Sequence, residues 1–359
     1  MPDTHEDIRR RLFDAAWETP AYPPEAERTI GRARRRATIT IGGTALAVVL
    51  TIVLATSSLR IGPKEQTAIP PRSTDLREFL IDVDTGKVTE ISDMPILERA
   101  WHVNVSPDGR QIAFASDATG SIEIYLANLD GTELEQVTEG STDVGDPHVS
   151  PSGEEIAYWA LDGSGIRNVH VTDLASGRSR RITRESVDVW GLEWSPDERS
   201  ILYSVSIAAE PTGVEEGYFH VNSTLNLMRA VDVQTRRIEK VFGGEKTMAY
   251  DGVWTPDGIL FVRGTGQVGG IPERVDLAVL DATGRPQRVV DLDVEYWDEQ
   301  VYSPQPSPDG RTIAYTRAFE GAEHVFLADV ETGRTWELHR GFTASWVDAD
   351  TLLVQDVPE

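Results

Sequence analysis

The stretch VSPDGRQIAF, residues 105–114, decides the fold because it joins a tight turn to the start of a strand. Proline presets φ at the first corner of a turn, aspartate caps the turn, and glycine takes a positive φ. The alternating residues IAF that follow are typical of a β-strand. One copy of this stretch therefore predicts a turn that leads into a strand.

The stretch recurs five times along the chain. The copies are VSPSGEEIAY at 149–158, WSPDERSILY at 194–203, WTPDGILF at 254–261, PSPDGRTIAY at 306–315 and a worn WVDADTLLV at 346–354. Their serine-type positions, 106, 150, 195, 255, 307 and 347, are 44, 45, 60, 52 and 40 residues apart, a period typical of solenoids and propellers. We assign a structural role in these turns to Ser106, Pro107, Asp108, Gly109, Ser195, Pro196, Asp197, Ser307, Pro308, Asp309 and Gly310.

A second repeated segment alternates with the first, as in FLIDVDTGKVTEI at 79–91 and VFLADVETGRTWEL at 325–338. Each copy has the pattern strand, Asp/Gly turn, strand, which predicts a hairpin. Six units of four strands predict an all-β, six-bladed β-propeller over residues 76–359. The chain opens on an outer hairpin and closes on an inner one. We therefore expect two strands from each end to form one composite blade, which removes exposed edges.

The acidic charge belongs to the repeat region. The chain has 34 basic and 59 acidic residues, a formal net charge of −25. Residues 1–59 hold 8 arginines and 7 acids, so residues 60–359 carry −26. This balance excludes nucleic acid as the main partner, because phosphate binding requires a basic surface.

Ala37–Leu59 is a run of 23 residues without a charge. As a helix it spans about 34 Å, enough to cross the ~30 Å hydrocarbon core of a bilayer. Four arginines lie among residues 32–36, and the positive-inside rule then places residues 1–36 in the cytoplasm and the propeller outside. We expect a single-pass cell-membrane protein. The alternative is a secreted protein, cleaved near residues 55–58.

Two short segments flank the predicted transmembrane helix. Residues 1–36 form a cytoplasmic stub, in which a capping box at Thr4 and Asp7 and apolar residues at helical spacing predict a short helix over 5–17. Residues 60–75 contain three prolines and are expected to form an extended linker.

The paired motifs W-S-P-D-G-x-x-I-A-F and D-x-x-T-G resemble the TolB-like propeller repeats, also called WD-like or PD-type. The resemblance covers about four fifths of the chain and implies a propeller that binds partner proteins, as periplasmic TolB does. Similar blades also gate prolyl-oligopeptidase-type hydrolases. This chain lacks the separate N-terminal α/β domain of TolB, so TolB's own partners are not carried over. Its layout resembles that of membrane-anchored actinobacterial propeller proteins.

Several kinds of chemistry are excluded or disfavoured. The absence of cysteine excludes disulfides, thiolate metal sites and cysteine nucleophiles. The loop GTGQVG at 264–269 matches a dinucleotide-binding pattern, but Pro272 and the next strand leave no room for the helix that this site needs. We expect no catalytic residues, no cofactor and no metal. At Asp143, Asp146 and His148 the alternative to a solvated acidic loop is a metal-binding pair.

The face opposite the S-P-D turns carries the longer and less regular loops, which leaves it free to recognise a ligand. Aromatic and carboxylate side chains there suit a cationic peptide, a protein loop or a sugar. For Trp101, Trp190 and Trp297 the alternative is packing between blades. The predicted ligand-binding face contains Trp101, His102, Asp143, Asp146, His148, Asp188, Trp190, Tyr250, Asp251, Tyr296, Trp297 and Asp298.

The sequence therefore predicts a membrane-anchored, extracytoplasmic binding module or scaffold rather than an enzyme. Its partner would be a protein, peptide or carbohydrate outside the membrane, and the lipid bilayer would hold Ala37–Leu59. One alternative is a sensor that relays ligand binding to a cytoplasmic regulator of the sigma-factor type. Another is a lyase or hydrolase that uses the propeller funnel.

Overall fold

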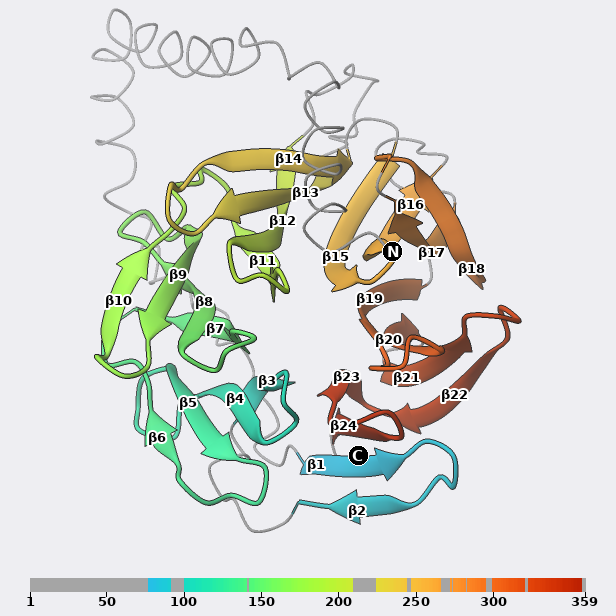
Figure 1. Ribbon diagram of the computed structural model, residues 1–359, viewed down its shortest axis with the longest axis horizontal. Helices are drawn as coiled ribbons and strands as arrows, with labels where there is room; N and C mark the ends of the chain where they lie inside the picture. The colour runs from blue at the N-terminus through green and yellow to red at the C-terminus, as the bar shows by residue number, and fades with distance from the viewer. Residues whose placement is uncertain are drawn as a thin grey trace, which may run out of the picture. The chain divides into compact units, whose positions relative to one another are not determined.

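The computed structural model describes residues 77–91, 100–140, 142–208, 224–243, 247–265, 272, 274–281, 283–294, 299–319 and 322–356. These residues form twenty-four β-strands and no helix, in six four-stranded antiparallel sheets set around a ring (Figure 1). The prediction of a six-bladed propeller is confirmed.

Nothing in this part of the chain is a helix of the length and hydropathy needed to cross a membrane. The predicted stub 1–36, the predicted span Ala37–Leu59 and the predicted linker 60–75 lie outside the described residues.

Blades 1 to 5 are each built from four consecutive strands, with the first strand innermost. Blade 1 contains β3 (Ala100–Val105), β4 (Gln111–Ser116), β5 (Glu123–Asn128) and β6 (Glu135–Gln136); blade 2 contains β7 (Val144–Val149), β8 (Glu155–Leu161), β9 (Arg167–Asp173) and β10 (Arg178–Arg181); blade 3 contains β11 (Val189–Trp194), β12 (Ser200–Ala208), β13 (Thr224–Asp232) and β14 (Ile238–Gly243); blade 4 contains β15 (Thr247–Thr255), β16 (Gly258–Thr265), β17 (Arg274–Leu280) and β18 (Pro286–Val294); blade 5 contains β19 (Glu299–Pro306), β20 (Thr312–Phe319), β21 (Ala322–Asp329) and β22 (Thr335–Arg340).

Blade 6 closes the ring with strands from both ends of the chain. Its order is β23 (Phe342–Trp346), β24 (Thr351–Asp356), β1 (Arg77–Asp82) and β2 (Val88–Glu90), from the inside outward. β1 pairs antiparallel with β24 over six residues, from Arg77 opposite Asp356 to Asp82 opposite Thr351. The expected two-plus-two closure is confirmed.

The S-P-D turns connect the first strand of a blade to the second, and their serine and aspartate hold them together. In blade 1 the Ser106 hydroxyl donates to Asp108 Oδ1 at 2.6 Å and accepts the backbone N–H of Gln111 at 2.9 Å. Blades 3 and 5 repeat the serine–aspartate bond at Ser195 and Ser307. The sequence explains this geometry, since a short polar side chain at the turn replaces lost backbone partners. We call this end of the ring the turn face and the opposite end the loop face.

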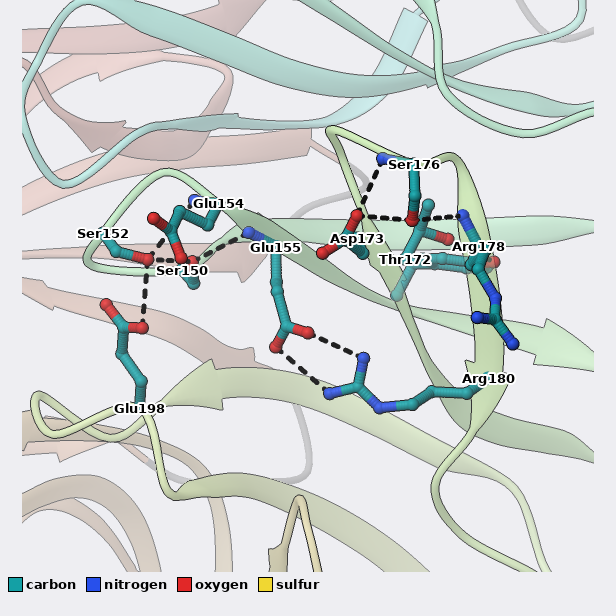
Figure 2. A network of polar contacts seen from close by, with 11 residues as sticks. Ser150, Ser152, Glu154, Glu155, Thr172, Asp173, Ser176, Arg178, Arg180 and Glu198 are labelled. Atoms are coloured by element: carbon teal, nitrogen blue, oxygen red, sulfur yellow. Dashed lines mark hydrogen bonds and ion pairs between the residues drawn. The ribbon is translucent and has the colours of Figure 1, made fainter.

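Blades 2 and 3 depart from the turn motif at two positions that meet. Blade 2 has Ser152 where other turns have aspartate, and blade 3 has Glu198 where others have glycine. Glu198 adopts the positive φ of that glycine, +57°, and its carboxylate accepts a hydrogen bond from the Ser152 hydroxyl at 3.0 Å. Figure 2 shows this contact between the two turns beside the bidentate pair of Arg180 and Glu155. The two departures therefore form one contact between neighbouring blades.

We expect Ser152→Ala and Glu198→Ala to be coupled in a double-mutant cycle by about 0.5 to 1 kcal/mol of unfolding free energy, the range of an exposed charge-assisted hydrogen bond. Urea unfolding of the two single variants and the double variant measures the coupling. Additive effects of the two substitutions would show that the contact does not stabilise the blade interface.

The core lies between the blades, and tryptophans of two turn motifs bridge it. The indole of Trp194 in blade 3 donates to the carbonyl of His148 in blade 2 at 2.9 Å. The indole of Trp346 in blade 6 likewise donates to the carbonyl of Gln305 in blade 5 at 2.9 Å. Trp194 and Trp346 are 4% and 8% exposed, and Trp254 is partly buried against the cluster of blades 3 and 4. All three tryptophans therefore pack between blades.

Candidate functional site

Every inner strand is interrupted by a β-bulge, where its pairing with the second strand shifts register. In blades 1 to 5 one residue of each bulge has a positive φ of 51° to 59°, and each lies four residues before the serine-type position of the turn. These residues are His102, Asp146, Gly191, Asp251 and Ser303. A bulge re-aims side chains at the point where it occurs, so the repeat places five such points around the centre of the ring.

The bulges are joined in series by hydrogen bonds from one blade to the next. His102 Nδ1 accepts the backbone N–H of Asp146 at 3.3 Å, and Asp146 Oδ2 accepts that of Leu192 at 3.0 Å. The Ser204 hydroxyl of β12 accepts the N–H of Asp251 at 3.0 Å, and Asp251 Oδ2 accepts that of Ser303 at 2.9 Å. The side chains of the inner bulges therefore satisfy backbone donors that the bulges leave unpaired.

Gly191 explains why blade 3 uses Ser204 instead of a bulge side chain. Gly191 has φ +59°, and a Cβ placed on it would lie 2.6 Å from Asp251 Oδ1 and 3.6 Å from the Ser204 hydroxyl. Only glycine leaves room there for the Asp251 carboxylate to reach Ser303. The glycine is thus required by the contacts between the inner bulges rather than by a turn.

We expect Gly191→Ala to lower the free energy of unfolding by about 2 to 3 kcal/mol, from left-handed strain together with displacement of the Asp251 carboxylate. Gly86→Ala is the matched control, because Gly86 has φ +66° with nothing within 4 Å of the added Cβ. It should cost only the strain, about 1 kcal/mol. Equal losses in the two variants, measured by urea unfolding, would contradict the steric role of Gly191.

His148 is the centre of a partly buried polar cluster two residues beyond the bulge of blade 2. Its Nε2 lies 3.1 Å from Asp146 Oδ1 and 3.4 Å from Asn104 Nδ2, and its Nδ1 lies 3.5 Å from Glu193 Oε2 of blade 3. The side chains of His148, Asp146 and Glu193 are 15%, 17% and 26% exposed. The cluster therefore joins blades 1, 2 and 3 by charge as well as by hydrogen bonds.

The cluster shifts the proton affinities of its members in opposite directions. Although burial opposes it, the charge and hydrogen bond of His148 hold the pKa of Asp146 at about 2. Burial works against His148 too, yet the charge of Asp146 raises the pKa of its imidazole. Burial raises the pKa of Glu193 to about 7, with the charge of Asp146 adding to the shift. Burial likewise raises the pKa of Asp251 to about 7, against the hydrogen bond from Ser303.

A pH dependence follows from Glu193. Its folded-state pKa lies above the unfolded value near 4.5, so its contribution to stability is present below pH 4.5 and is lost as pH rises through about 7. We expect the free energy of unfolding of Glu193→Gln, measured relative to that of the wild-type protein, to be about 1 to 2 kcal/mol higher at pH 8.5 than at pH 5.5. Parallel pH profiles of the variant and the wild-type protein, measured by denaturant unfolding, would contradict the assignment.

Most of the predicted ligand-binding residues lie in strands rather than in the loops where the sequence placed them. Trp101, His102, Asp146, His148, Trp190, Tyr250 and Asp251 belong to inner strands. The correction has a physical cause, since pairing with the second strand continues beyond the bulge, as at Trp101 opposite Ala115. Asp143 and Asp188 lie in loops and are exposed, while Tyr296, Trp297 and Asp298 lie outside the described residues.

The three described aromatic residues of this set pack into the protein. Trp101 packs against the core between blades 1 and 2, and Trp190 against the core of blades 4 and 5. Tyr250 is 6% exposed and donates its hydroxyl to the Val301 carbonyl at 2.9 Å. The exposed member of the inner bulges is His102, whose ring meets Trp159 edge to face at 6.2 Å.

Asn104, Glu193 and Ser204 contribute to the cluster but were not predicted. Asn104 and Glu193 lie two residues before the serine-type position, as His148 does. Aligning the repeats at that position would have identified the first two. Ser204 lies on a second strand, so no such alignment points to it. Among the described residues no group of three or more His, Asp or Glu is arranged to hold a metal ion.

Comparison with known proteins agrees with this geometry. Residues 72–215 match the family model of the TolB beta propeller domain. This part of the propeller is similar to the TolB beta propeller domain. A solved Agrobacterium tumefaciens structure that carries the name TolB superposes with a TM-score of 0.60 at 18% identity, over 79% of this chain and 99% of that one. At this identity the match supports the fold alone.

Two curated relatives match shorter stretches. An uncharacterized protein of Agrobacterium fabrum is 27% identical over 139 residues, which is 35% of this chain and 45% of the relative. A TolB homolog of Chlorobaculum tepidum is 27% identical over 132 residues, which is 37% of this chain and 27% of the relative. The matched stretches thus span less than half of either relative.

Proposed function

We propose that this TolB-like propeller is a binding module for a protein segment, held outside the cytoplasm by one membrane span. The observation that carries the proposal is the polar cluster at the inner bulges. Carboxylates and histidines from blades 1 to 4 gather there on strands that a continuous ring holds in place. A rigid scaffold with polar groups at fixed positions suits recognition, because little conformational freedom is lost on binding.

The charge of the module favours a cationic or neutral partner. Residues 60–359 carry −26, and the cluster and the neighbouring bulges together hold three carboxyl groups, Asp146, Glu193 and Asp251, and two histidines. Lysine or arginine side chains of a partner would find complementary charge at this site. Relatives that carry the name TolB support a protein as the partner class, and a carbohydrate is an outcome of the test.

Anchoring rests on Ala37–Leu59, whose 23 uncharged residues follow four arginines. The test is fractionation of cells that express the full-length chain, followed by protease treatment of intact cells. The proposal expects the chain in the membrane fraction and the propeller open to the protease. A propeller that is protected until the cells are lysed would overturn it. Secretion of a shortened chain would show that the segment is cleaved.

Site-specific photo-crosslinking of the full-length chain in living cells tests the binding site. A photoreactive residue at His102, which is exposed in the inner bulge of blade 1, should capture a protein partner. The matched control is Arg110 in the same blade, which is 84% exposed beyond the S-P-D turn. Capture from position 110 and not from 102 would contradict binding at the inner bulges. Capture of a glycan and no protein would show that the partner is a carbohydrate instead of a protein.

A further inference from the structure

The seam that closes the ring contains a buried carboxyl group that pairs with no cation among the described residues. Glu78 of β1 stands opposite Gln355 of β24, and the two side chains belong to residues that are 2% and 0% exposed. Gln355 Nε2 donates to Glu78 Oε1 at 2.8 Å and to the Ala100 carbonyl of β3 at 2.9 Å. The pair thus joins the first strand, the last strand and blade 1.

The orientation of the Gln355 amide is determined by Ala100. A backbone carbonyl only accepts hydrogen bonds, so the amide nitrogen must face Ala100, and the same nitrogen serves Glu78. This leaves Gln355 Oε1 as a buried acceptor with no hydrogen-bond donor. An unsatisfied buried acceptor is costly, and a donor is missing at this place.

Other buried carboxyl groups on third strands are satisfied in a different way. Asp276 of β17 forms a bidentate pair with Arg263 at 2.7 and 2.6 Å. Glu123 of β5 accepts hydrogen bonds from two hydroxyl groups and from the backbone N–H of Gly140. Among the described residues, the donors to Glu78 are the Gln355 amide and the backbone N–H of Glu78 itself. Its surroundings therefore suit a neutral carboxylic acid, which has its own O–H to donate.

We propose that Glu78 is a proton-sensitive latch of the ring. As a neutral acid it accepts from Gln355 Nε2 and donates its O–H to Gln355 Oε1, which satisfies both buried side chains. Loss of the proton to solvent removes that donor and leaves a buried negative charge between β1 and β24. The seam then loosens at the pair of strands that holds the two ends of the chain together.

None of the described charged groups on the neighbouring elements contributes to the raised pKa of Glu78, whose causes are burial and hydrogen bonds. Asp82 is the last residue of β1 and Lys87 follows the turn after it, whereas His339 of β22 contacts Phe79, the residue next to Glu78. The register places Arg77 opposite Asp356 and Phe79 opposite Glu90, one position away from Glu78 on either side. His102 of β3 is turned toward the Trp159 ring of blade 2.

The direction of the pH effect follows from burial. Burial raises the pKa of Glu78 to about 7, against the hydrogen bond from Gln355. Stability from the proton is complete below the unfolded value near 4.5 and is lost as pH rises through about 7. Between pH 5.5 and 8.5 this change alone lowers the folding equilibrium constant about thirtyfold.

The test is Glu78→Gln in the full-length chain, because glutamine keeps both hydrogen bonds and cannot ionise. At pH 5.5 the variant should be about as stable as the wild-type protein. At pH 8.5 its folding equilibrium constant should be about thirtyfold larger than that of the wild-type protein. Hydrogen exchange should show that wild-type amides of β1 and β24 lose protection at pH 8.5, whereas those of the variant keep it. Wild-type and variant profiles that stay parallel between the two pH values would overturn the proposal.

Two further measurements separate the latch from a general effect. Glu123→Gln, the same substitution on a third strand of blade 1, should leave the protection of β1 and β24 unchanged. In the wild-type protein with ¹³C-labelled glutamate, two carboxyl resonances should titrate near pH 7, and one of them should persist in Glu193→Gln. This measurement uses the wild-type protein, so it tests the proposal even if Glu78→Gln fails to fold. The proposal is overturned if every described glutamate except Glu193, and therefore Glu78, is ionised at pH 6.

Discussion

Arg263→Met is expected to lower the free energy of unfolding by about 3 to 5 kcal/mol, because it leaves the Asp276 carboxylate buried without its cation. Arg263 Nε and Nη2 donate to the two oxygens of Asp276 at 2.7 and 2.6 Å, between β16 and β17 of blade 4. The side chains are 12% and 2% exposed. Water cannot replace the guanidinium at that depth, so the carboxylate loses its bidentate cation without gaining a substitute from solvent.

The matched control is Arg180→Met in blade 2. Arg180 forms the same bidentate pair with Glu155, at 2.7 and 3.1 Å, but these side chains are 34% and 26% exposed. Its loss should cost less than about 1 kcal/mol, since water and salt already screen the pair. The double variant Arg263→Met, Asp276→Leu should recover most of the loss, because it removes the stranded charge. Equal costs for the two arginine substitutions in urea unfolding would show that burial does not decide the difference.

His148→Leu is expected to lower the free energy of unfolding by about 2 to 4 kcal/mol at pH 8, because Asp146 and Glu193 would then lose the imidazole that both contact. Asp146 and Glu193 lie 3.1 and 3.5 Å from the two ring nitrogens of His148. The loss should be smaller at pH 5.5, where the raised pKa of Glu193 lets that carboxyl group take up a proton.

The control for this substitution adds Glu193→Gln to His148→Leu. Removing the second charge should restore part of the stability at pH 8 and little at pH 5.5. The same full-length chains are compared by denaturant unfolding at both pH values. A single variant that unfolds within about 0.5 kcal/mol of the wild-type protein at pH 8 would show that the cluster does not stabilise the inner bulges.

The sequence predicted the parts of the fold that depend on residues close to each other in the chain. The S-P-D turns, the hairpins and the composite blade follow from local turn chemistry and the repeat period, and Ser106 with Asp108 shows the expected turn contact. The inner bulges could not be predicted in the same way. A bulge adds a residue and interrupts the alternation that marks a strand, so Trp101 and Tyr250 were placed in loops although they lie in paired strands.

The candidate site was predicted in part for the same reason. His102, Asp146, His148 and Asp251 were selected as polar residues near inner strands, and they lie close to one another in the ring. Their partners depend on contacts between neighbouring blades, such as the 46 positions that separate Asp146 from Leu192. Gly191 was indistinguishable from a turn glycine, because the Asp251 carboxylate that excludes a Cβ comes from the next blade.

The two-plus-two closure also determines when the protein can finish folding. Glu78 and Gln355 are 277 positions apart, so the ribosome completes β1 and β2 long before their inner partner β24 exists. Blades 1 to 5 are continuous in the chain and can assemble one after another during synthesis. Throughout that time β1 has an unpaired edge, which another chain's β24 can occupy. Nascent chains at high density are therefore at risk of exchanging their last strands.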